Sequence, residues 1–155
     1  MSDSSCITVQ DFVRLLWEKF DQTRSSATVS PSADINTILH YGHLQGWLED
    51  WDEHDSQRFV DKKAAARIIN QFMKIELTIP DIEDKETYSK AEELRDLYLC
   101  RACANHIAHV YVRGIMEAEF IEANGQEALI FNGSRTITCK EAEEIIIQLK
   151  NYLYK

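Results

Sequence analysis

Apolar residues recur at every third or fourth position in three stretches of the chain, residues 7–20, 60–73 and 137–153. This period matches one face of an α-helix, which completes a turn about every 3.6 residues. In the second stretch the apolar stripe passes through Ile68 and Ile69. Each stretch is therefore predicted to form an amphipathic helix that packs one face against a hydrophobic core.

The three stretches also begin alike. Thr8, Asp61 and Thr138 each have a side-chain oxygen that can cap the first turn of a helix. Glu141 follows Thr138 by three positions, which is the spacing of a capping box. The β-branched apolar residues that precede the caps are Ile7, Val60 and Ile137. We therefore expect three helix starts in equivalent registers, which indicates an internal repeat.

The segments upstream of the second and third starts support this repeat. Residues 35–48 align without a gap with residues 103–116, and the alignment places Gly46 on Gly114. Glycine readily adopts the left-handed conformation in which many helices end. The repeat unit is thus predicted to contain a first helix, a glycine stop, a connector and a capped second helix.

These patterns predict an all-α fold of about five helices, built from helix–loop–helix repeats. The chain is expected to form one domain over residues 1–155. Within it we expect a half repeat at 7–20 and repeats at 33–76 and 90–153.

Two further elements follow from local signals in the second half of the chain. Ser89 and Glu92 have the spacing of a capping box, which predicts a helix that starts there and continues to Arg113. Asn124 and Gly125 form a favoured turn pair between short apolar runs. A short β-hairpin is therefore expected around this turn.

Two composite motifs resemble a known family. "VYVRGIM" followed by "FNGSRTITCKEAEEIIIQL" is similar to one S-layer homology repeat, and "LHYGHLQGWLED" followed by "RFVDKKAAARIINQFM" is similar to another. Residues 7–20 resemble the second helix of a third unit whose first helix is absent. The family pattern is a helix that runs into a glycine, a loop with a phenylalanine, and Ile-Thr-Arg-x-Glu-Ala at the start of the second helix.

The resemblance implies both an arrangement and a function. It implies three repeats around a pseudo-threefold axis and the anchoring of proteins to an anionic cell-wall polysaccharide. In the family, the arginine of the Ile-Thr-Arg motif helps to bind this glycan. The equivalent positions here are Val9, Lys62 and Cys139, so that only Lys62 brings a positive charge.

The function expected from this resemblance is that of a non-catalytic binding module for a cell-wall glycan or a protein partner, without a cofactor. Lys62, Lys63, Trp47 and Trp51 are the candidate ligand-binding residues. An alternative is a cytoplasmic helical adaptor or oligomerisation protein. Because the half repeat leaves one core face under-covered, we also expect a second copy to cover that face in a homodimer.

Composition and charge narrow the classes of partner. The chain has 155 residues, 45% of them hydrophobic, and a net charge of -9. The chain is therefore long enough to bury a hydrophobic core. Its negative charge is expected to repel nucleic-acid phosphates and anionic membranes. No apolar run approaches the roughly 20 residues that span a bilayer. The first residues lack the pattern of a secretory signal, which favours the cytoplasm, or the cell surface if the chain is a processed form.

A cysteine and histidine cluster is the strongest candidate for chemistry. Cys100, Cys103 and His106 follow one another at intervals of three residues. They allow three interpretations: a metal site, a reactive thiol with a base, or the inner face of a helix. The helical setting and the lack of a second ligand pair favour the inner face. A metal-binding protein that uses these three residues remains an alternative.

An acidic segment between the repeats has a second candidate pattern. In residues 49–61, the acidic and hydroxyl side chains crudely follow the oxygen ligands of a calcium loop. Asp55 occupies the position of the loop glycine, and Asp61 replaces the bidentate glutamate. A solvated acidic connector is therefore the preferred interpretation.

Overall fold

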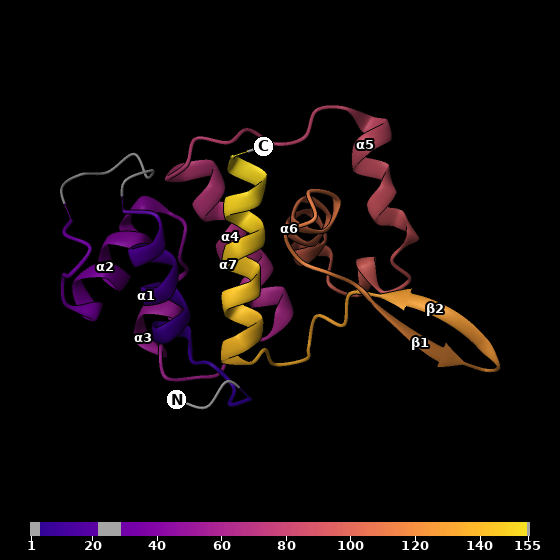
Figure 1. The fold of residues 1–155 in the computed structure, drawn as a ribbon, viewed down its shortest axis with the longest axis horizontal. Helices are drawn as coiled ribbons and strands as arrows, with labels where there is room; N and C mark the ends of the chain where they lie inside the picture. Colours follow the sequence, from indigo (N-terminus) through magenta and orange to yellow (C-terminus); the bar gives the residue numbers. More distant parts are fainter. Residues whose placement is uncertain (1–3, 22–28, 155) are drawn as a thin grey trace.

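A computed structural model describes residues 4–21 and 29–154. The elements in chain order are α1 (Val9–Lys19), α2 (Ile35–Gln45), α3 (Asp50–His54), α4 (Lys62–Ile75), α5 (Lys85–Ser89), the 3₁₀ turns η1 (Lys90–Glu93) and η2 (Leu97–Leu99), α6 (Arg101–Val112), β1 (Glu119–Ala123), β2 (Gln126–Ile130) and α7 (Cys139–Leu153). In Figure 1, α4 and α7 lie at the centre, with α1, α2 and α3 on one side and α5 and α6 on the other. The β1–β2 hairpin extends away from the helices.

The extended segments that lead into α1, α4 and α7 form a closed ring of backbone hydrogen bonds. Val60 N donates to Ile7 O at 3.0 Å, Ile137 N donates to Val60 O at 3.0 Å, and Ile7 N donates to Ile137 O at 3.2 Å. All three side chains are buried. One cyclic set of backbone hydrogen bonds therefore joins the three predicted helix starts.

A second ring of hydrogen bonds surrounds the first. The backbone N–H groups of Val9, Lys62 and Cys139, one position after each cap, donate at 2.9 Å to the carbonyls of Arg58, Arg135 and Ser5, respectively. Each cap behaves as predicted: the side chains of Thr8, Asp61 and Thr138 accept hydrogen bonds from the backbone N–H groups three residues on. The capping box of Thr138 and Glu141 is complete. These starts are confirmed.

An aromatic cluster fills the core between α1, α2 and α4. The Trp47 ring stacks on Trp17 with centroids 6.0 Å apart and meets Phe72 edge-on at 5.0 Å. Gly42 makes room for it, because a Cβ there would lie 2.7 Å from Leu48 Cδ1 and 3.0 Å from Trp47 Cζ2. The chain after α2 can therefore fold back on the helix, and Gly46 permits the turn with a φ of 93°.

Neighbouring helices cover one face of α1 and one face of α4, whereas the surface between α1 and α7 is open. α2 packs against α1, and α6 packs against α4. Between α1 and α7, among the residues that the structure describes, a groove of about 350 Å³ remains, lined by Leu15, Lys19, Glu143, Ile146, Ile147 and Lys150. We call it the α1–α7 groove. Ile147, on α7, is 54% exposed there.

The predicted all-α class is wrong. The fold is mixed, because seven α-helices are accompanied by an antiparallel two-stranded sheet within the described residues. The hairpin turn is where the sequence predicts it: Asn124 and Gly125 both have positive φ, which matches the right-handed twist of the two strands. In the described part of the chain, no helix has the length and apolar content that a bilayer crossing requires.

The long helix predicted from Ser89 to Arg113 is also wrong. The segment divides into α5, two 3₁₀ turns and α6, and Ser89 ends α5 rather than starting a helix. The Asp96 carboxylate accepts hydrogen bonds from Phe131 N and Asn132 N, both at 2.8 Å. These hydrogen bonds to a distant loop compete with a continuous helix. Leu94 and Cys100, on either side of Asp96, accordingly adopt extended conformations.

Thr138→Ala tests the capping of the third predicted helix start. The substitution removes the acceptor for Glu141 N, so the free energy of unfolding should fall by about 1 kcal/mol in urea denaturation. Thr37→Ala, at an exposed position in α2, is the control and should cost less than about 0.5 kcal/mol. Equal losses from the two variants would contradict a specific role for the Thr138 cap.

Candidate functional site

Two of the four predicted ligand-binding residues, Trp51 and Lys63, lie in one groove. We call it the aromatic–basic groove; its volume is about 460 Å³. Its walls come from α3, the extended segment before α4, and the facing sides of α4 and α6. The lining residues are Glu49, Trp51, Arg58, Phe59, Asp61, Lys63, Ala64, Arg67, Cys100, Ala102, Cys103 and His106.

Two aromatic rings are exposed in this groove. Trp51 is 55% exposed and Phe59 is 58% exposed, whereas Trp17 and Trp47 are fully buried. The guanidinium of Arg58 lies over the Trp51 ring, 4.4 Å from its centroid. Glu49 accepts a hydrogen bond from Trp51 Nε1 at 2.8 Å. These contacts hold the indole in a fixed orientation with part of its surface open to a ligand.

A buried carboxylate organises the two arginines of the groove. Asp52 has no exposed surface, and its two oxygens accept hydrogen bonds from Arg67 at 2.7 and 3.0 Å. Arg58 donates to the same carboxylate. Burial by itself raises the pKa of Asp52, but the hydrogen bonds and charge of Arg67, aided by Glu49 N and Arg58, hold this pKa below its ordinary value. Asp52 is therefore ionised and fixes both guanidinium groups.

The remaining polar groups of the groove are also paired. Lys63 Nζ lies 2.6 Å from Asp61 Oδ2. His106 Nδ1 lies 3.0 Å from Asn70 Nδ2. Burial lowers the pKa of His106, and the positive charges of Arg67 and Lys74 lower it further. At neutral pH, His106 is therefore an uncharged imidazole, and the charge of the groove comes from its arginines, lysine and carboxylates.

The structure joins two of the three residues in the Cys100, Cys103 and His106 alternative. Cys100 and Cys103 form a disulfide, so neither offers a thiolate to a metal in this state. Over residues 4–21 and 29–154, no three His, Cys, Asp or Glu side chains converge as a metal site. The three residues do lie together, because all of them line the aromatic–basic groove.

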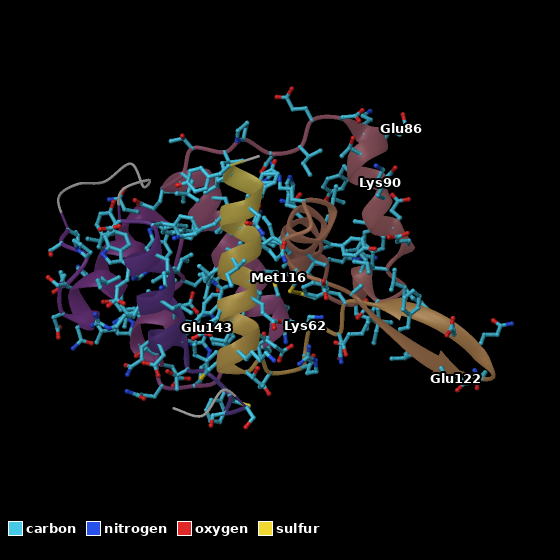
Figure 2. All side chains as sticks on the ribbon, viewed as in Figure 1. Lys62, Glu86, Lys90, Met116, Glu122 and Glu143 are labelled. Carbon is cyan, nitrogen blue, oxygen red and sulfur yellow. A yellow bond between two sulfur atoms is a disulfide. The ribbon has the colours of Figure 1, made fainter. Side chains whose placement is uncertain are left out.

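The other two predicted ligand-binding residues lie elsewhere. Trp47 is in the aromatic core, where no ligand reaches it. Lys62 is only 4% exposed, and its Nζ contacts Glu117 O at 3.0 Å and Glu119 at 3.3 Å. Figure 2 shows Lys62 between α7 and the base of the hairpin. Burial lowers the pKa of this lysine, although the charge of Glu119 opposes the shift.

The hollow beside Lys62 is acidic. It has a volume of about 430 Å³, and Lys62 and Arg135 are its two cations. Arg135 already pairs with Glu119 at 3.0 Å and with Glu141 at 2.8 Å. Because Glu144 adds a further carboxylate, this hollow does not favour an anionic ligand. The position that the family resemblance assigns to the glycan is therefore occupied by internal ion pairs.

The acidic segment before α4 is more ordered than the sequence predicts. Residues 50–54 form helix α3, and the Glu49 and Asp52 side chains complete its capping box. Asp52 cannot serve as a calcium ligand here, because both of its oxygens contact arginines in the protein interior. The solvated connector predicted for residues 49–61 is thus in part a folded support for the groove.

Three residues that line the groove, Arg58, Phe59 and Arg67, were not predicted from the sequence. One signal for Phe59 was present, since neighbours in an extended segment point to opposite sides and Val60 is an apolar core position. Arg67 lies one helical turn after Lys63, on the same side of α4. Nothing local indicates that Arg58 and Arg67 share the Asp52 carboxylate, because that contact depends on the folding of α3 onto α4.

Comparisons with protein-family models, curated proteins and solved structures gave no significant match.

Asp52→Asn tests the support of the groove. Loss of the charge leaves Arg58 and Arg67 incompletely paired, and the free energy of unfolding at pH 7 should fall by about 3 kcal/mol. The folded pKa of Asp52 is below its ordinary 3.8, so its ionic contribution is present above that value and is lost as the pH falls through the folded pKa. The difference between wild type and variant should therefore shrink below about pH 4.

Urea denaturation at several pH values provides the measurement. The matched control is Asp50→Asn, an exposed carboxylate on the same helix, which pairs with His54 across one turn. Its effect should stay below about 0.5 kcal/mol. A difference for Asp52→Asn that is small or independent of pH would show that the two arginines do not depend on this carboxylate.

Proposed function

We propose that the chain is a non-catalytic binding module that holds a saccharide chain in the aromatic–basic groove. The observation that carries this proposal is the exposure of Trp51 and Phe59 in a single groove. Large exposed apolar side chains in a concave surface mark binding sites, since their hydration is unfavourable. Flat aromatic rings pack against the C–H faces of sugar rings, while nearby polar groups bind the hydroxyls.

The charged groups support a saccharide with acidic substituents. Arg58 lies against Trp51 and donates to the Asp52 carboxylate and to the carbonyls of Trp51 and Asp55. A guanidinium with five N–H groups retains further donors after these bonds. Arg67 and Lys63 lie along the same wall. Their partner carboxylates keep the groove near neutrality, so an acidic group would bind through directed hydrogen bonds more than through net charge. This differs from the Lys62 hollow, where carboxylates outnumber cations.

Trp51→Ala tests the saccharide site. Titration of the protein with purified pyruvylated cell-wall polysaccharide should show binding by calorimetry, and the variant should weaken it by about tenfold or more, since truncated aromatic anchors typically cost more than 1 kcal/mol. Phe120→Ala is the matched control, because Phe120 is an exposed aromatic residue on the hairpin and lies outside the groove. The control should bind like wild type.

Binding of the polysaccharide by the Trp51→Ala protein at wild-type affinity would exclude the groove as the site. No binding by wild type would exclude this class of ligand. The circular dichroism spectrum of each variant confirms that the fold is retained, since both substituted side chains lie at the surface.

We also propose that the chain forms a homodimer through the α1–α7 groove. The reason is that, among the described residues, α7 lacks the covering helix that α1 and α4 each have. α2 and α6 cover the equivalent faces of α1 and α4, whereas Ile147 is open to solvent on α7. Glu143 and Lys150 are both on α7 and line this groove, at equal sequence distances from the Ile146–Ile147 pair. Glu143 lies on the side of α7 that faces α1 (Figure 2).

Antiparallel packing of α7 against a second copy would place Glu143 of each copy near Lys150 of the other. A twofold axis through the Ile146–Ile147 region satisfies both ion pairs with the same surface. The two isoleucines would then form the apolar centre of the contact. A second copy of the chain is thus an occupant that matches the charges and the apolar centre of this groove.

Charge reversal tests this dimer. Lys150→Glu should lower the dimer fraction measured by light scattering, because it places like charges opposite one another. The double variant Glu143→Lys, Lys150→Glu restores opposite charges and should restore the dimer. A monomer mass for wild type that does not change with concentration would exclude the dimer, as would a double variant that is no better than the single variant.

A further inference from the structure

The Cys100–Cys103 disulfide lies at the start of a helix. Cys100 is the N-cap of α6, and Cys103 is in the first turn of this 12-residue helix. Cys100 supplies no side-chain hydrogen bond to cap the helix. The free N–H groups of a first turn stabilise negative charge at the N-cap, so this position favours a thiolate when the disulfide is reduced.

The two sulfur-bearing residues differ in their surroundings. Cys103 lines the aromatic–basic groove and is partly buried against the hydrophobic core. Cys100 lines the aromatic–basic groove and also a second hollow of about 240 Å³, which it shares with Leu99 and Ser134. An incoming thiolate can therefore approach Cys100 from the second hollow, without entering the space beside Trp51. Cys100 is the sulfur that we expect to be attacked, and Cys103 the one that leaves.

Two large hydrophobic side chains close to Cys100 in the chain are exposed. Leu99, the preceding residue, is 88% exposed, and Tyr98 is 61% exposed. Such side chains do not stabilise a small hydrophilic thiol, but they can pack against the side chains that flank a cysteine in a peptide. The arrangement combines a reactive bond with a docking surface for a polypeptide.

We propose that Cys100–Cys103 is a thiol–disulfide exchange site for cysteine-bearing polypeptides, a function separate from saccharide binding. A partner thiolate attacks Cys100 Sγ, a mixed disulfide forms, and the Cys100–Cys103 bond breaks with its electron pair on Cys103. A second thiolate of the partner attacks the partner sulfur and releases Cys100. The partner dithiol is oxidised by two electrons to a disulfide, the Cys100–Cys103 pair is reduced, and the two thiol protons of the partner pass to the two cysteines.

The reverse reaction provides the assay, because exchange is reversible. Wild-type protein with dithiothreitol should accelerate the reductive precipitation of insulin over dithiothreitol alone. Cys100→Ser should abolish the acceleration, and Cys6→Ser should leave it unchanged, since Cys6 is a free cysteine outside the site. Failure of wild type to accelerate the reaction would overturn the proposal, whatever the variants do.

The identity of the attacked sulfur is tested in the reduced Cys103→Ser protein. Treatment with glutathione disulfide, followed by peptide mass spectrometry, should place the mixed disulfide on Cys100 about tenfold faster than on Cys6 of the same molecule. Equal rates at Cys100 and Cys6 would overturn the proposal. Trp51→Ala separates the two functions, because it should weaken saccharide binding but accelerate insulin precipitation as wild type does, since the second hollow gives access to Cys100 away from Trp51.

Discussion

The fold depends on the closed ring of backbone hydrogen bonds between Ile7, Val60 and Ile137. Each residue donates to one neighbour and accepts from the other, so three extended segments far apart in sequence satisfy one another's buried backbone groups. The cap residue of a central helix follows immediately after each of them. The ring therefore fixes the positions and directions of α1, α4 and α7 relative to one another. Loss of one segment would leave the other two with unpaired backbone polar groups.

The sequence predicts the three helix starts well because their signals are local. A β-branched residue, a capping residue and an apolar stripe follow within a few positions at each start, and the glycines that end α2 and α6 act on their own turns. The break before α6 could not be predicted in the same way. It depends on hydrogen bonds from the backbone of Phe131 and Asn132 to Asp96. These residues are at least 35 positions apart, so the hydrophobic pattern of the segment does not reveal the contact.

The candidate site was predicted less completely for the same reason. Trp47 and Trp51 are four residues apart and equally suited by type to a binding surface, yet one is core and the other is exposed. The difference arises because Gly42 lets Trp47 turn into the aromatic cluster, whereas the Asp52 carboxylate holds α3 with Trp51 on the outside. Both causes are tertiary contacts, so residue type and spacing do not separate the two tryptophans.

Equivalent positions in the two helix–loop–helix segments explain why the aromatic–basic groove is open, whereas ion pairs occupy the Lys62 hollow. Trp51 and Glu119 each lie five residues after the helix-ending glycine, and in the second case the carboxylate pairs with Lys62 and Arg135. Ala64 and Glu141 each lie three residues after the cap, and Glu141 again pairs with Arg135. The later segment thus fills its hollow with internal ion pairs. The earlier segment has the Trp51 ring and the Ala64 methyl group at the same positions, so its groove stays open. Its arginines are held instead by the buried Asp52 carboxylate.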